Sequence, residues 1–166
     1  LIFRNTPQWF ISMETTGLRA TALAEIEKTR FVPPQGRNRI HAMVASRPDW
    51  LVSRQRAWGV PITLFVHRQS GQYLVDASVN ARIIAAVKAE GVDAWSAARA
   101  QEYLGADYQA DDYEQVTDIL DVWFDSGSTH LTVLKGSHEA ESAFPADLYL
   151  EGSDQHRGWF HSSLLV

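Results

Sequence analysis

The chain has 166 residues, of which 45% are hydrophobic and 21% are charged, and its formal net charge is −5. These values are typical of a soluble globular protein with one ordinary core. The sequence contains no cysteine, which excludes a disulfide framework and a thiolate metal site. No apolar run approaches the roughly 18 residues of a membrane span, and no basic-then-apolar leader is present. We therefore expect no membrane partner.

Charge is distributed unevenly along the chain. Residues 1–70 carry ten Lys or Arg and four Asp or Glu, whereas residues 71–166 carry five and sixteen. A basic half is compatible with contact to a polyanion. Neutralisation of the two halves by each other, across an internal interface, is an equally good explanation.

The first part of the chain is predicted to hold one strand and two helices. The strand covers residues 1–10. Apolar residues on one face predict a helix over 18–28. A second helix is predicted over 37–46, and Pro48 ends it.

Residues 47–62, RPDWLVSRQRAWGVPI, combine arginine with tryptophan. Asp49 is expected to cap a short helix here. The guanidinium groups of Arg54 and Arg56 suit bidentate recognition of phosphate or carboxylate. Pairing with the acidic half of the chain is the structural alternative, and the sequence leaves the two open.

Residues 68–117 are predicted to be mainly helical and contain no motif that indicates chemistry. A hairpin over 62–75 leads into a helix that Ser78 caps and that ends at Gly91. A further helix is predicted over 94–104. We interpret this block as an insertion in a larger sheet domain. The expected division is 1–67, 68–117 and 118–166.

The last part of the chain is predicted to hold two buried strands, each followed by a polar turn. The strands are 119–124 and 148–150, and a helix over 131–142, interrupted near Gly136, joins them. Ligands bind at the carboxyl ends of parallel strands in α/β folds. We therefore predict an α/β fold with both turns at one edge of a sheet.

The second turn opens the segment EGSDQHRGWF, residues 151–160. Gly152 is expected to adopt a positive φ angle there. Ser153 or Asp154 is expected to cap a helix that begins at once. Such a helix start favours an anionic ligand.

The residues of these turns also allow two other kinds of site. A metal site could use Asp125, His130, Asp154 and His156, but no HExxH motif or cysteine pair supports it. The run FDSGS resembles the elbow of aspartic peptidases, whose chemistry needs two carboxylates that share a proton. The chain holds one copy, so Asp125 could act in this way only in a homodimer.

Four separated segments, in order, resemble class I aminoacyl-tRNA synthetases. They are PQWFISM, RPDWLVSRQRAWGVPI, LDVWFDSGSTH and YLEGSDQHRGWFHSSLL. The last two are most similar to the isoleucyl branch of bacterial type. The resemblance covers nearly the whole chain and is weakest over residues 70–116.

The resemblance implies an internal fragment of a Rossmann-like catalytic domain with a small helical insertion. The family activates isoleucine with ATP and Mg²⁺ to isoleucyl-adenylate, then charges tRNA(Ile), as a cytoplasmic and monomeric enzyme. Both ends of the chain look cut, and the sequence contains neither a HIGH-type nor a KMSKS-type motif. We therefore expect the chain alone to be inactive. A non-catalytic binding module derived from a synthetase is the alternative.

The resemblance also implies which residues bind isoleucyl-adenylate. The matching positions are Glu151, Gly152, Asp154, Gln155, Trp123 and Trp159. Gly152 and Asp154 match positions that hold the ribose, and Gln155 one near the polar groups of the amino acid. The two tryptophans match walls of the isoleucine pocket. No side chain is implied as a general acid or base.

Overall fold

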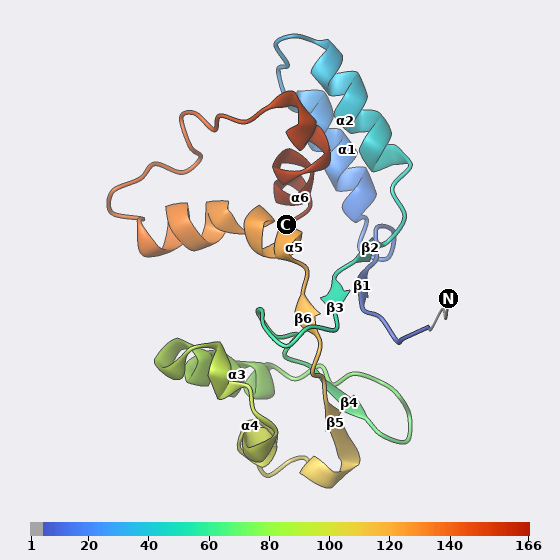
Figure 1. The fold of residues 1–166 in the computed structure, drawn as a ribbon, viewed down its shortest axis with the longest axis vertical. Coiled ribbons are helices and arrows are strands. Elements are labelled where there is room, and N and C mark those ends of the chain that lie inside the picture. Colours follow the sequence, from blue (N-terminus) through green and yellow to red (C-terminus); the bar gives the residue numbers. More distant parts are fainter. Residues whose placement is uncertain (1–4) are drawn as a thin grey trace. The chain divides into compact units, whose positions relative to one another are not determined.

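The computed structural model describes residues 5–166, which form two compact units (Figure 1). The first unit holds the described residues up to Ser53 together with Asp121–Val166, and the second unit is Arg54–Leu120. Each unit combines helices with short strands, so the chain is α/β in composition. The expected insertion, 68–117, lies inside the second unit, and the three-part division stays a prediction.

The described strands are short and form three two-stranded pairs, β1–β2, β3–β6 and β4–β5. In the first unit β1 is antiparallel to β2, with Phe10 opposite Leu51. The elements that lie in the first unit or at its edge are β1 (Phe10–Ile11), α1 (Leu18–Lys28), α2 (Gln35–Ala45), β2 (Trp50–Leu51), β3 (Ser53–Arg54), α5 (Val122–Gly127), the π-helix η4 (His130–Ser137), the 3₁₀-helix η5 (Ser153–Arg157) and α6 (Trp159–Leu165).

Helices α1 and α2 lie side by side and confirm the two helices predicted from the apolar pattern (Figure 1). Each buries two residues of one face: Ala22 and Ile26, then Ile40 and Val44. The guanidinium of Arg19 donates hydrogen bonds to carbonyl oxygens at the end of α2, including that of Val44 at 2.6 Å. A cation at this end satisfies carbonyl groups that have no partner within the helix.

Helices α5 and α6 pack closely because Gly127 has no side chain. A Cβ atom at Gly127 would lie 2.8 Å from the carbonyl carbon of Ser162 on α6. The buried ring of Trp50 lies 5.8 Å from that of Phe124 and joins β2 to α5. This packing fixes the helix that carries the candidate site against the rest of the first unit.

The second unit combines two helices with the antiparallel pair β4–β5. Its elements are β4 (Phe65–His67), α3 (Ala77–Glu90), the 3₁₀-turns η1 (Val92–Ala94), η2 (Ala97–Arg99) and η3 (Ala110–Asp112), α4 (Ala100–Leu104), β5 (Tyr113–Gln115) and β6 (Ile119–Leu120). Phe65, Ile83 and Tyr103 lie in its core. The indole nitrogen of Trp95 donates a hydrogen bond to the carbonyl of Val116 at 3.0 Å.

Several local predictions in the first half of the chain need correction. Residues 1–4 lie outside the described part, and the strand expected over 1–10 begins only at Phe10. Asp49 caps no helix; its carboxylate accepts a hydrogen bond from the Met13 amide at 2.8 Å, and a strand follows it. The cap of α3 is Asp76 rather than Ser78, because the Asp76 carboxylate accepts from two amides of the first turn.

Two predicted strands in the second half also need correction. The first ends at Leu120 instead of Phe124, because the Asp121 carbonyl accepts from the Phe124 amide at 2.8 Å and starts α5. The second, 148–150, is not a strand: Leu150 is 83% exposed. A strand needs a neighbour to satisfy its backbone groups, and within residues 5–166 no strand pairs with this run.

The predicted helices after residue 90 are shorter and less regular than expected. The one over 94–104 is divided into η2 and α4. The one over 131–142 is the π-helix η4, and non-helical angles at Gly136 confirm the predicted interruption. Within residues 5–166 no helix is long and apolar enough to cross a membrane.

Candidate functional site

The segment EGSDQHRGWF forms a turn followed by two helical pieces instead of one helix. Gly152 precedes η5 with a φ angle of −71°, so the expected positive φ is wrong. No side chain caps η5, which corrects the expected role of Ser153 or Asp154. Gly158 ends η5 and separates it from α6.

Three of the predicted site residues lie together at the start of η5. The Asp154 carboxylate lies against Gly152, where an added Cβ atom would be 2.6 Å from its Oδ1 atom. The amide of Gln155 donates to Asp154 Oδ2 at 3.2 Å, and its Oε1 atom accepts from the Trp159 amide at 2.8 Å. Glu151 is exposed beside this group. The exposed turn therefore presents the Asp154 carboxylate and the Gln155 side-chain amide, which are hydrogen-bonded to each other.

Trp159 is the best-anchored of the predicted residues. Its indole nitrogen donates to the carbonyl of Ser126 at 3.0 Å and to the hydroxyl of Thr129 at 3.2 Å. Its ring stacks on Tyr149 with a centroid separation of 3.5 Å. These contacts hold the indole plane in one orientation.

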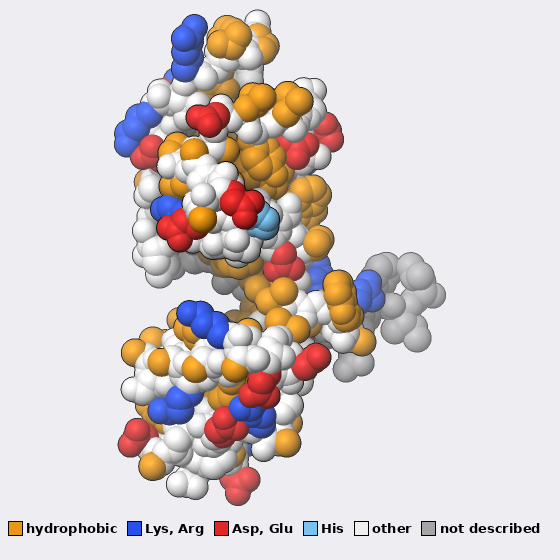
Figure 2. All heavy atoms as spheres, turned by 90° about the vertical axis from the view of Figure 1, so that its left-hand side faces the viewer, with side chains coloured by type: hydrophobic (Ala, Val, Ile, Leu, Met, Phe, Trp, Pro, Cys, Tyr) orange, Lys and Arg blue, Asp and Glu red, His pale blue; other side chains and the backbone are white. Residues whose placement is uncertain are grey.

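Trp159 also lines a mainly apolar cavity of about 660 Å³ in the first unit. Its other walls come from η4 and the loop after it, and include Val133, Leu134, Phe144 and Leu148. On this face of the first unit hydrophobic side chains are exposed among charged ones (Figure 2). The cavity offers room and an apolar lining for a branched alkyl group.

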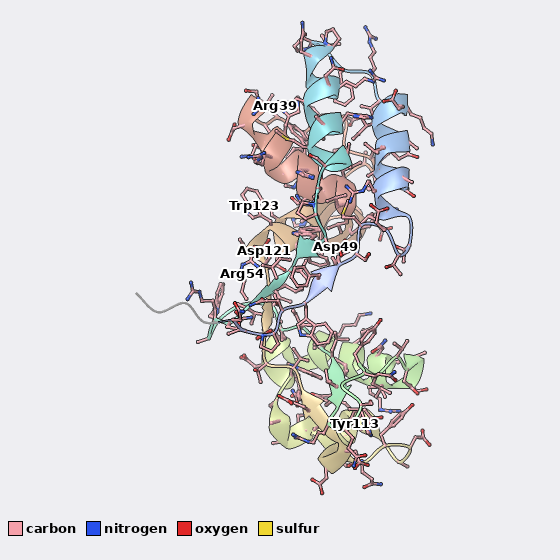
Figure 3. The ribbon with its side chains drawn as sticks, turned by 90° about the vertical axis from the view of Figure 1, so that its right-hand side faces the viewer. Arg39, Asp49, Arg54, Tyr113, Asp121 and Trp123 are labelled. Atoms are coloured by element: carbon pink, nitrogen blue, oxygen red, sulfur yellow. The ribbon has the colours of Figure 1, made fainter. Side chains whose placement is uncertain are left out.

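Trp123 lies elsewhere in the same unit. It projects from α5 (Figure 3) and is 43% exposed. Its ring lies against Gly158, 3.2 Å from the position of a Cβ atom there. Trp123 does not line the cavity that Trp159 borders. Trp123 therefore contacts Gly158, the residue before Trp159, but the two tryptophans do not face one another across that cavity.

The structure does not contain the arrangements that an aspartic-peptidase elbow or a metal site at Asp125 would need within residues 5–166. FDSGS forms the last part of helix α5 and its C-cap, Ser128, and it does not form an elbow after a strand. Burial, and then the charge of Asp121, raise the pKa of Asp125. In the described part of the chain no three or more His, Cys, Asp or Glu side chains are placed to hold a metal ion.

A second pocket of about 610 Å³ was not foreseen from the sequence. Among the residues that line it are Arg39, Arg47, Arg157 and His161. The nearest ring nitrogen of His161 is 3.2 Å from an Nη atom of Arg47. Burial, followed by the charges of Arg47 and Arg157, lowers the pKa of His161 to about 4, so its imidazole is neutral at pH 7. No local pattern links these residues, because they come from two segments, 39–48 and 157–161, that are far apart in the sequence.

Arg54 and Arg56 belong to the second unit. Arg54 lies in β3 and is half-buried (Figure 3). Arg56 is exposed. The neighbouring Trp58 is 91% exposed. Contact of these arginines with a polyanion stays a prediction, as does the alternative that they pair with acidic residues of the chain.

Comparison with known proteins gives the family. The model of the family described as tRNA synthetases class I (I, L, M and V) matches residues 2–166. The chain belongs to this family. The resemblance carried by the four segments is thereby confirmed, and the aspartic-peptidase alternative is not favoured.

Bacterial relatives within the synthetase family are similar over almost all of the chain. Isoleucine–tRNA ligases of Pelagibacter ubique, Zymomonas mobilis and Hahella chejuensis are 54%, 56% and 57% identical to it, each over 99% of this chain. The matched regions are 18%, 18% and 17% of those proteins. The chain thus spans less than a fifth of the length of these relatives.

Proposed function

We propose that this chain is part of an isoleucine–tRNA ligase. The enzyme would join isoleucine to ATP, giving isoleucyl-adenylate and pyrophosphate, and then transfer isoleucine to tRNA(Ile). The observation that carries this proposal is the identity of 54–57% to isoleucine–tRNA ligases over 99% of the chain. A role in protein synthesis also leads us to expect a cytoplasmic and monomeric parent enzyme.

The turn at the start of η5 is proposed to bind the ribose and the polar groups of the amino acid. A carboxylate accepts hydrogen bonds from hydroxyl groups, and Asp154 is exposed and oriented by Gln155. Gly152 leaves the backbone open to close approach. Glu151 adds a negative charge that suits the ammonium group of the substrate. These features support binding of isoleucyl-adenylate at this turn.

Trp159 and Trp123 are proposed as walls of the isoleucine side-chain pocket. Rigid indole planes exclude water and fit a branched alkyl group. The support is stronger for Trp159, which has a fixed orientation and borders the apolar cavity of about 660 Å³. Trp123 would act from the other side of Gly158, against which it lies.

We infer that this chain supplies one side of the site, within a Rossmann-like domain. Adenylate formation depends mainly on positioning and on stabilisation of charge. ATP brings the phosphates, and Mg²⁺ is held chiefly by such phosphates with few protein ligands. Neither a HIGH-type nor a KMSKS-type motif occurs in the 166 residues. We therefore expect no isoleucine-dependent pyrophosphate exchange from this chain alone. A non-catalytic module would also fail to support exchange when placed in a complete ligase.

A graft tests the proposed site. The chain would replace the matching segment of the Zymomonas mobilis ligase, with which it shares 56% identity. In this enzyme we expect Trp159→Ala to raise the KM for isoleucine at least about tenfold and the KM for ATP less than about twofold. Trp58→Ala, which removes an exposed tryptophan of the second unit, is the control and should change neither. Equal losses for isoleucine and ATP would contradict the pocket role.

A further inference from the structure

The pocket lined by Arg39, Arg47, Arg157 and His161, here called the arginine pocket, has no role in the function proposed above. It lies in the first unit, where α2 contacts η5 (Figure 3 labels Arg39 on α2). No Asp or Glu is among its lining residues. Arg39 and Arg157 are exposed, and neither forms an ion pair within the described residues 5–166. Two cationic groups therefore stand uncompensated at its rim.

Arg47 is held in place below this rim. Its guanidinium lies 5.3 Å from the ring centroid of Trp50 and 3.2 Å from a nitrogen of His161. Its Nε atom is buried and has no hydrogen-bond partner. Burial lowers the pKa of Arg47, and the nearby charge of Asp121 opposes that shift. A buried donor without a partner costs free energy, so the contacts within the protein do not fully satisfy the Arg47 guanidinium.

The neighbouring His161 side chain adds no charge of its own at pH 7. His161 is 5% exposed and faces Arg47 as a neutral ring. Ser46, at the end of α2, completes the polar part of the lining. The lining of the pocket thus combines three guanidinium groups and a neutral imidazole, and the Asp121 carboxylate, whose charge acts on Arg47, is not part of that lining.

We propose that the arginine pocket binds a phosphate group. Guanidinium groups match phosphate oxygens in a bidentate way, and three of them around one space suit a multiply charged anion better than a single carboxylate. The volume of about 610 Å³ leaves room for a ligand that is larger than one phosphate group. Its source is either a free oligophosphate or the backbone of a polynucleotide.

Calorimetric titration of the 166-residue chain tests this proposal. The probes are inorganic pyrophosphate and a 12-nucleotide single-stranded RNA of mixed sequence, at two salt concentrations. In the double variant Arg39→Gln/Arg157→Gln we expect at least about tenfold weaker binding of the probe that the unmodified chain binds. The matched control is Arg30→Gln/Arg37→Gln, which removes the same charge from exposed positions of the first unit outside the pocket. It should weaken binding less than about threefold.

The outcomes separate the two sources and can overturn the proposal. Binding of pyrophosphate identifies a free oligophosphate as the source, and binding of RNA alone identifies a polynucleotide backbone. Either result supports a phosphate site if Arg39→Gln/Arg157→Gln loses binding of that probe. Binding of neither probe at millimolar concentration overturns the proposal, as does an equal loss in both double variants. Thermal melting of each variant checks that the fold is retained. The isoleucine and ATP measurements on the graft use other residues, so the two proposals fail independently.

Discussion

The anchoring of Trp159 can be tested by replacing its indole with a phenyl ring. Trp159→Phe keeps an aromatic ring that can stack on Tyr149 but removes the nitrogen that donates to Ser126 and Thr129. The Thr129 hydroxyl still donates to the Ser126 carbonyl at 3.0 Å, so that oxygen keeps one partner. Loss of one hydrogen bond costs about 0.5–1.5 kcal/mol. With the smaller buried area, we expect the free energy of unfolding to fall by about 1–2 kcal/mol.

Urea denaturation followed by far-ultraviolet circular dichroism measures this loss without relying on tryptophan fluorescence. Trp123→Phe is the matched control, because Trp123 belongs to the same unit and is 43% exposed. We expect its free energy of unfolding to change by less than about 0.5 kcal/mol. An unchanged stability for Trp159→Phe, or an equal loss in both variants, would refute the anchoring of the indole.

Three further predictions follow from the packing and the titrating groups. Gly127→Ala should lower the free energy of unfolding by about 1–3 kcal/mol, because its Cβ atom would lie 2.8 Å from the backbone of Ser162; a raised melting temperature would show that α5 and α6 are less tightly packed. The pKa of His161 is lowered from 6.5 to about 4, so the unfolded chain takes up the proton first and stability falls as the pH drops from about 6.5 to 4. His161→Gln should make urea midpoints flatter across that range, and an unchanged slope would contradict the buried neutral ring. The pKa of Asp76 is lowered, chiefly by the amide of Val79, so its contribution is present above about pH 3.8 and is lost as the pH falls through the lower folded value. Asp76→Asn keeps an oxygen for the cap but should reduce the acid-induced loss of hydrogen-exchange protection at the Val79 amide; the same loss of protection in both proteins would disprove this linkage.

Helices with a clear apolar face could be predicted from the sequence. Those at 18–28 and 37–46 agree with α1 and α2 within about two residues, because burial of one face determines them locally. The break near Gly136 was also predictable from the residue itself. Strands were predicted less well, because their existence depends on a partner. Strand β4 lies within the hairpin expected over 62–75 and β6 begins at Ile119 as expected, but the apolar run 148–150 is exposed in the absence of a paired strand within residues 5–166.

The candidate site shows the same division between local and distant contacts. The grouping of Gly152, Asp154 and Gln155 follows from their proximity in the sequence. The contact of Arg47 with His161 joins residues 114 positions apart, and no periodic pattern reports such a pairing. The arginine pocket therefore could not be predicted from the sequence, because its residues meet only in the folded chain.

Amino-acid-dependent pyrophosphate exchange by the grafted ligase tests the central proposal most directly. The family description covers isoleucine, leucine, methionine and valine enzymes, so these four amino acids are the natural comparison. We predict exchange with isoleucine at a rate within about tenfold of the unmodified ligase, and a higher kcat/KM for isoleucine than for the other three. A folded graft that shows no exchange, or that prefers leucine, methionine or valine, would contradict the proposal that this chain belongs to an isoleucine–tRNA ligase.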